Sequence, residues 1–205
     1  MGKTRAEQAQ LTKDRIMEAA TKLFSKKGFD DVSMQDIAKA ANCTAGNIYH
    51  YFGSKEELML HSMDSMDDKY KAFYTRLQTE PEFCDLPASQ KLRLFLEEVM
   101  KIMSEEKHLT NLYVYALKNP QSGMKFWRDS RVIYKAYHKL AVEMQENGEL
   151  SQQQDVDVIS QQLITLTRGI MITGLINEGQ WDVSKASREF FDVYFRGLLT
   201  EAKSK

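Results

Sequence analysis

The stretch GFDDVSMQDIAKAANCTAGNIYHYFGSKEELML, residues 28–60, decides how this chain of 205 residues folds. It contains two short segments with the apolar spacing of helices, at about residues 34–41 and 45–52. Ser33 stands at the N-cap position of the first segment, and Asp36, three residues later, completes an acidic version of a capping box. Only residues 42–44 separate the two segments. Two short helices joined by so tight a turn predict a helix-turn-helix.

Longer helices are predicted on both sides of this pair. The preceding helix runs from about Thr12 to Lys27, and its apolar residues recur on one face: Ile16, Ala20, Leu23 and Phe24. The following helix opens after a second N-cap residue, Ser54, with Glu56 and Glu57 in the first turn, where the helix dipole favours anions.

Helical periodicity continues to the end of the chain, and the three prolines all lie between periodic segments. Further helices are predicted at about residues 88–103, 108–118, 122–147, 155–177 and 184–203. The last two are apolar over a wide arc, which predicts burial in a core or against a partner. We find no strand pattern and no internal repeat, so the predicted fold class is all-α.

Composition and charge narrow the class of protein. Residues 1–29 carry a net charge of +4, whereas the whole chain carries −1, so the remaining residues carry −5. A basic head on an acidic body is typical of a chain whose N-terminal end binds a polyanion, although a solvated helix face gives the same pattern. We find neither an apolar run long enough to span a membrane nor a secretory signal. Cys43 and Cys84 form no metal-ligand or redox pattern, which favours the cytoplasm.

The second helix of the pair has few choices of outward face. Ile48 and Phe52, four residues apart, are predicted to point into the core with Ile37 and Leu23. The residues left for the outside are small or form hydrogen bonds: Thr44, Ala45, Gly46, Asn47, Tyr49 and His50. Such a surface suits a helix in the major groove of DNA, where Asn47 can offer a donor and an acceptor to adenine and Ala45 can meet a thymine methyl.

Other residues are expected to reach phosphates, which position a protein on DNA without reading sequence. These are Ser33, Tyr49, His50 and Lys55. The outward helix has no Arg or Lys, so the bidentate pairing of Arg with guanine is not open to it, and A·T contacts or DNA shape carry more weight.

Residues 28–41 and 46–58, together with residues 15–20 and the pair Leu23–Phe24 before them, resemble the TetR (tetracycline repressor) family. The resemblance covers about residues 10–60 and implies an all-α homodimer in which each subunit binds one half of an operator. It implies a three-helix DNA-binding domain in residues 1–55 and a helical ligand-binding and dimerisation domain in residues 56–205. Proteins of this kind are regulators, and the implied function is a repressor that a small molecule releases from DNA.

By position, the DNA contacts of the family fall on a set of residues within both helices and at the start of the next one: Ser33, Gln35, Thr44, Ala45, Gly46, Asn47, Tyr49, His50 and Lys55. One departure is Asn42, where the family usually has glycine. Asn adopts the left-handed conformation more readily than most residues, so we expect the turn to be kept.

The C-terminal half offers aromatic and methionine side chains that suit an irregular, largely apolar effector. The candidate ligand-binding residues are Met103, Tyr113, Trp127, Tyr137 and Arg168. For any single aromatic or methionine residue, however, a plain core role is the favoured interpretation. Arg168 could meet an anionic ligand or pair with an acid across a dimer.

The last two helices are the candidate dimer interface, where Gly169 and Gly174 could allow close approach. Two other functions were weighed. A DNA-binding protein whose C-terminal half only dimerises or binds a protein partner fits the same sequence. An enzyme is not supported, because we find no nucleophile elbow, phosphate loop, zinc-ligand set or dinucleotide fingerprint. No cofactor and no metal are expected.

Overall fold

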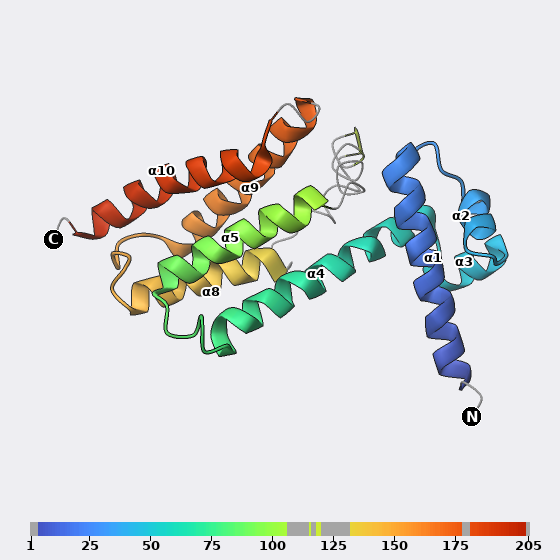
Figure 1. Ribbon diagram of the computed structural model, residues 1–205, viewed down its shortest axis with the longest axis horizontal. Coiled ribbons are helices and arrows are strands. Elements are labelled where there is room, and N and C mark those ends of the chain that lie inside the picture. The colour runs from blue at the N-terminus through green and yellow to red at the C-terminus, as the bar shows by residue number, and fades with distance from the viewer. Residues whose placement is uncertain (1–3, 106–114, 116–117, 120–131, 178–180, 204–205) are drawn as a thin grey trace. The chain divides into compact units, whose positions relative to one another are not determined.

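The computed structural model describes residues 4–105, 115, 118–119, 132–177 and 181–203, and every regular element among them is an α-helix (Figure 1). The elements are α1 (Arg5–Lys27), α2 (Met34–Ala40), α3 (Ala45–Phe52), α4 (Lys55–Thr79), α5 (Ala88–Glu105), α8 (Val132–Glu146), α9 (Val156–Ile176) and α10 (Val183–Lys203). The all-α prediction is therefore confirmed. The predicted helix at 108–118, apart from residues 115 and 118, and the first ten residues of the one at 122–147 lie outside the described residues.

The described residues form two compact units. The first contains residues 4–66 with 115 and 118–119, and the second contains the remainder, so that α4 begins in one unit and ends in the other. None of the described helices is long and apolar enough to cross a membrane. Both cysteines, which are described, are free thiols.

The first helix is longer than predicted, because it begins at Arg5 rather than near Thr12. Its N-cap is Thr4, whose hydroxyl accepts a hydrogen bond from the backbone N–H of Glu7 while the Glu7 carboxylate accepts one from the backbone N–H of Thr4. This reciprocal capping box satisfies two N–H groups that lack partners within the helix. Residues before Thr12 have no apolar periodicity, so the capping box was the only sequence signal for this start.

In the second unit, α5, α8, α9 and α10 pack on one another, and aromatic residues of α4 join them. Phe95 of α5 is fully buried at the centre. Its ring centroid lies 5.7 Å from that of Tyr137, 6.2 Å from that of Tyr74 and 6.5 Å from that of Tyr70. The first two contacts are edge-to-face, the arrangement that ring quadrupoles favour.

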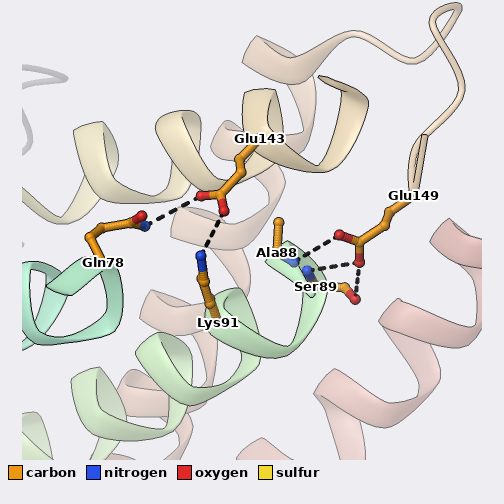
Figure 2. Close-up of polar contacts among 6 residues, drawn as sticks. All are labelled: Gln78, Ala88, Ser89, Lys91, Glu143 and Glu149. Carbon is orange, nitrogen blue, oxygen red and sulfur yellow. Dashed lines mark hydrogen bonds and ion pairs between the residues drawn. The ribbon is translucent and has the colours of Figure 1, made fainter. Parts of the chain in front are cut away.

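A buried ion pair joins α5 to α8 (Figure 2). Lys91 is only 4% exposed, and its Nζ donates to the Glu143 carboxylate at 2.8 Å. Gln78 of α4 donates to the other Glu143 oxygen at 3.3 Å. Burial, together with the negative charge of Glu143, raises the pKa of the neighbouring Tyr74 hydroxyl. Because a buried charge is costly without partners, this cluster favours one alignment of the three helices.

The start of α5 is capped from a distance. Pro87 precedes this helix and has no side-chain acceptor, so the first N–H groups need another partner. The Glu149 carboxylate, from the loop after α8, accepts from the backbone N–H of Ala88 at 2.7 Å and of Ser89 at 3.0 Å, and from the Ser89 hydroxyl (Figure 2). A carboxylate at this end of a helix also interacts favourably with the helix dipole.

Replacing Glu149 by Ala should lower the free energy of unfolding by about 1–3 kcal/mol, because two half-buried N–H groups lose a charged acceptor. Urea unfolding at one fixed protein concentration measures this change. The matched control is Glu146→Ala. Glu146 is exposed at the end of α8, so its replacement should change stability by less than about 0.5 kcal/mol. Equal effects of the two variants would show that the cap contributes nothing.

Candidate DNA interface

The inward face of α3 is buried as predicted. Ile48 is fully buried, Phe52 is 5% exposed, and the predicted partner Ile37 on α2 is fully buried. Leu23 differs from the prediction, because it is only half-buried, whereas Ile16 and Ala20 of α1 are fully buried. Burying an Ile or Phe side chain contributes about 1.5–3 kcal/mol, so these contacts fix which way α3 faces.

The outward face of α3 carries the residues that the sequence assigned to DNA. Gly46, Asn47 and His50 are exposed, and Tyr49 is 53% exposed although it is a large hydrophobic residue. Ala45 is half-buried at the start of the helix. Its exposure leaves both the ring and the hydroxyl of Tyr49 accessible on the outward face.

The turn between α2 and α3 depends on Asn42, which has a φ of 50° and is the one described non-glycine residue with a positive φ. The backbone N–H of Cys43 then reaches the carbonyl of Ala38 at 3.0 Å, and that of Ala41 reaches Ile37 at 2.8 Å. These bonds close the end of α2 while the chain reverses toward α3. The prediction that Asn42 supports this turn is confirmed.

The start of α2 is a complete capping box. The Ser33 hydroxyl accepts from the backbone N–H of Asp36 at 3.1 Å, and an Asp36 carboxylate oxygen accepts from the Ser33 backbone N–H at 2.9 Å. The Ser33 hydroxyl also donates to that oxygen at 2.6 Å. These hydrogen bonds from the Ser33 side chain and backbone hold the pKa of Asp36 below its ordinary value.

The start of α3 has a related cap with a different third residue. The Thr44 hydroxyl oxygen accepts from the backbone N–H of Asn47 at 3.2 Å. The same hydroxyl donates to the Asn47 side-chain oxygen Oδ1 at 3.1 Å. The cap therefore orders the side chain of Asn47 as well as the first turn of the helix.

Lys55, at the start of α4, has a structural role that the sequence did not indicate. Its Nζ donates to the backbone carbonyls of Phe29 at 2.8 Å and Val32 at 2.9 Å, and it lies 4.2 Å from the centre of the Phe29 ring. Phe29 in turn packs against Tyr115, with ring centroids 4.2 Å apart. Lys55 thus holds the loop between α1 and α2 in place, with one N–H left for another acceptor.

The sequence profile described as "Bacterial regulatory proteins, tetR family" matches residues 16–61, which span α1 from Ile16 through the start of α4. The chain is 26% identical over 170 residues to the HTH-type transcriptional regulator UidR of Escherichia coli K12, a match that covers 80% of this chain and 82% of that one. Residues 16–61 are the DNA-binding region of a TetR-family transcriptional regulator.

Other TetR-type proteins are similar over shorter or longer stretches. The transcriptional repressor NicS of Pseudomonas putida is 36% identical over 76 residues, 37% of this chain and 36% of that one. Among solved structures, FadR of Bacillus subtilis in complex with stearoyl-CoA has a TM-score of 0.75 at 20% identity and covers 90% of this chain and 98% of that chain. NalD of Pseudomonas aeruginosa has a TM-score of 0.64 at 22% identity, with 94% and 98% covered. The structural likenesses show the fold.

The residues that the TetR resemblance assigns to DNA all lie in the first unit. Gln35 in the first turn of α2 and Lys39 in its last turn are exposed, whereas Ser33 and Thr44 already use their hydroxyl protons within the protein. DNA contact by the individual residues stays a prediction.

The candidate ligand residues of the C-terminal half are not gathered in one described cavity. Tyr113 and Trp127 lie outside the described residues. Met103, in the last turn of α5, and Tyr137 are buried, and the Tyr137 hydroxyl is 3.1 Å from that of Thr167. Arg168 follows Thr167 on α9 and is half-exposed.

The basic head of the chain lines a groove of about 450 Å³ along α1. Arg15, Lys22 and Lys26 contribute to it, and it ends at Asn42 in the turn before α3. Leu23 lies in the same groove, which explains its partial exposure. Three of the basic residues of the head therefore share one groove with the acidic Glu18.

Replacing Lys55 by Met keeps the apolar stem over Phe29 but removes the ammonium group. We expect weaker binding to every DNA sequence, with a logarithmic salt slope smaller by about one for each bound subunit, because a phosphate contact is lost. Titrations of specific and random DNA at several salt concentrations measure this.

The matched control is Lys71→Met, since Lys71 is exposed on α4 and belongs to the second unit. It should leave the slope unchanged. A Lys55→Met protein that loses stability but keeps the full slope would show that Lys55 serves only to hold the carbonyls of Phe29 and Val32.

Proposed function

We propose that this protein is a homodimeric repressor that binds an operator through α2 and α3 and leaves it when a small molecule binds in the C-terminal domain. The observation that carries the proposal is the two-sided character of α3. Its inner face is fixed by Ile48 and Phe52, while its outer face presents exposed, uncharged residues that form hydrogen bonds. A helix of this kind can enter the major groove and contact base edges.

In functional terms we assign residues 1–55 to DNA binding and residues 56–205 to dimerisation and the effector. All the residues assigned to DNA fall in the first range. The second range contains the aromatic core around Phe95 and the buried methionines Met100, Met103 and Met144. This composition supports an effector that is largely apolar.

Two related structures support a small-molecule effector. FadR of Bacillus subtilis was solved in complex with stearoyl-CoA, and NalD is described as the secondary repressor of a multidrug efflux pump. Both share the fold of this chain, and the residues that would select an effector lie outside residues 16–61, which the family profile matches. We therefore propose the class of effector and leave its identity to experiment.

Two residues from the C-terminal half of the sequence, Tyr115 and Lys118, lie in the first unit against the loop between α1 and α2. Tyr115, which follows α5 in the chain, is buried and packs against Phe29. Lys118 lies 3.4 Å from the Asp30 carboxylate in the same loop. Movement of Tyr115 and Lys118 would therefore act on the loop that Lys55 holds beside α2. A ligand that favours the moved state shifts the population away from DNA binding.

The outward faces of α9 and α10 are our candidate dimer interface. Val193 is 70% exposed, Val158 50% and Phe190 47%. A mainly apolar groove of about 570 Å³ runs along α9 to Tyr194, whose hydroxyl donates to Gln162 at 2.9 Å. Burial raises the pKa of Tyr194 to about 12, so this hydroxyl keeps its proton at neutral pH. A second copy of the chain would cover these apolar side chains by two-fold symmetry.

The function is tested by selecting bound fragments of genomic DNA with the purified protein and footprinting the enriched sequences. We expect a pseudo-palindrome protected over two successive major grooves, with half-site centres about 34–36 Å apart. Candidate effectors are then tested for release of this DNA. Enrichment no better than random DNA would contradict the proposed operator binding, whereas specific binding that no small molecule weakens would contradict only the effector.

Replacing Val193 by Glu should convert the dimer to a monomer, because the change places a charge in the centre of the proposed apolar interface. Analytical ultracentrifugation measures the mass of the particle. The matched control is Leu11→Glu, which introduces the same charge at a 42% exposed position on α1. A Val193→Glu protein that remains dimeric would place the interface elsewhere.

A further inference from the structure

The first three helices of the chain begin with the same kind of cap but differ at the third helical residue. In α1 and α2 the residue three positions after the hydroxyl cap is an acid, Glu7 or Asp36, whose carboxylate offers only acceptors. In α3 the residue three positions after the cap Thr44 is Asn47. A carboxamide has one acceptor oxygen and an NH₂ group with two donors, so the same cap uses only one end of this side chain.

The hydrogen bonds identify which end is used. The Thr44 hydroxyl oxygen already accepts from the Asn47 backbone N–H, and its single proton goes to Asn47 Oδ1 at 3.1 Å. The Asn47 oxygen is therefore drawn back to the start of α3. Its NH₂ group makes no hydrogen bond with any of the described residues, and the side chain is exposed on the outward face.

We propose that Thr44 positions Asn47 so that this side chain presents only donors to the DNA, and that the protein consequently prefers guanine to adenine at the base that Asn47 faces. The inference rests on the proposed binding of α3 in the major groove. Guanine offers two acceptors there, O6 and N7, which match the two N–H donors of the amide.

Adenine fits this arrangement less well. It offers the acceptor N7 but also the donor N6, which needs a side-chain oxygen that faces the base, whereas the bond from Thr44 turns Oδ1 toward the start of α3. Cytosine offers only a donor in the major groove. The inference therefore differs from the expectation drawn from sequence, in which Asn47 offers both of its groups to adenine. It also gives a helix without Arg or Lys a way to read guanine.

The test uses the operator obtained by selection, with each base of one half-site, and its symmetry mate, changed to the other three bases. Competition binding gives the relative affinities. The position that Asn47 reads is the one whose base preference disappears in Asn47→Ala. At that position the unaltered protein should prefer guanine to adenine by about tenfold, as a well-formed base contact allows.

Two variants separate the donor from the cap. Asn47→Asp keeps an acceptor for Thr44 and a favourable charge for the helix start, but it removes both donors. Its preference at this position should change to cytosine, whose N4 group donates. Repulsion between Asp and phosphates lowers affinity for all four operators equally, so it cancels in the comparison.

Thr44→Val removes the hydroxyl and frees the Asn47 oxygen, so the preference should move toward adenine. Thr44→Ser keeps the hydroxyl and should restore the preference for guanine. If the unaltered protein prefers adenine at this position, or Thr44→Val leaves the guanine preference in place, the proposal is wrong. Circular dichroism checks that Thr44→Val folds; if it does not, Asn47→Asp decides, and a retained guanine preference there rejects the proposal. Failure to select any operator would instead reject the DNA binding on which the inference rests.

Discussion

The constraint on which the DNA-binding unit depends is the shortness of α3. A helix of eight residues is not stable in water on its own, so it exists here only because Ile48 and Phe52 are buried. That burial leaves Asn47 and Tyr49 no direction but outward. The requirement for stability and the display of hydrogen-bonding groups are thus two consequences of one arrangement of apolar residues. The caps follow from the same constraint, because half of the backbone N–H groups of so short a helix lack partners within it.

Polar contacts from outside a helix fix its position where apolar packing alone would allow it to slide. In the second unit, Glu143 and Glu149 come from the end of α8 and the loop after it, and both reach the first turn of α5. One pairs with the buried Lys91 and the other caps Ala88 and Ser89. An apolar surface tolerates small shifts in register, whereas these carboxylates lose their partners if α5 moves by one residue. Lys55 holds the loop of Phe29 and Val32 in the first unit in the same manner.

The features that could be predicted from sequence are those encoded by neighbouring residues. The bounds of α3, the N-cap Ser33 and the turn at Asn42 depend on residues a few positions apart, and the predictions agree with the structure. The role of Lys55 could not be predicted, because its carbonyl partners are more than twenty residues away and any residue has a carbonyl. The capping of α5 by Glu149 is equally remote in sequence. The start of α1 was not predicted for another reason, because the prediction rested on apolar periodicity, which the residues between the Thr4–Glu7 capping box and Thr12 lack.

Glycine on α9 shows why the dimer interface needs evidence beyond sequence. The sequence alone does not distinguish Gly169 from Gly174. A Cβ added at Gly174 would lie 2.6 Å from the Val183 side chain, whereas one added at Gly169 would meet nothing within 4 Å. Gly174 therefore allows the chain to return closely from α9 to α10 within one subunit. Gly169 is the exposed one, on the same helix as Val158. Of the two glycines, only Gly169 can therefore allow the close approach of another subunit.

The absence of cations from α3 bears on how such a protein could release DNA. Affinity for DNA comes largely from phosphate contacts, and the cationic side chains near α3 lie outside it, at Lys55 and in the groove along α1. In the proposed complex, α3 contributes discrimination between bases and little charge. In the proposed mechanism, a change in the spacing of two subunits need not disturb the internal geometry of α3. It only has to move two sets of phosphate contacts out of register with the DNA, and each lost contact weakens binding to every sequence.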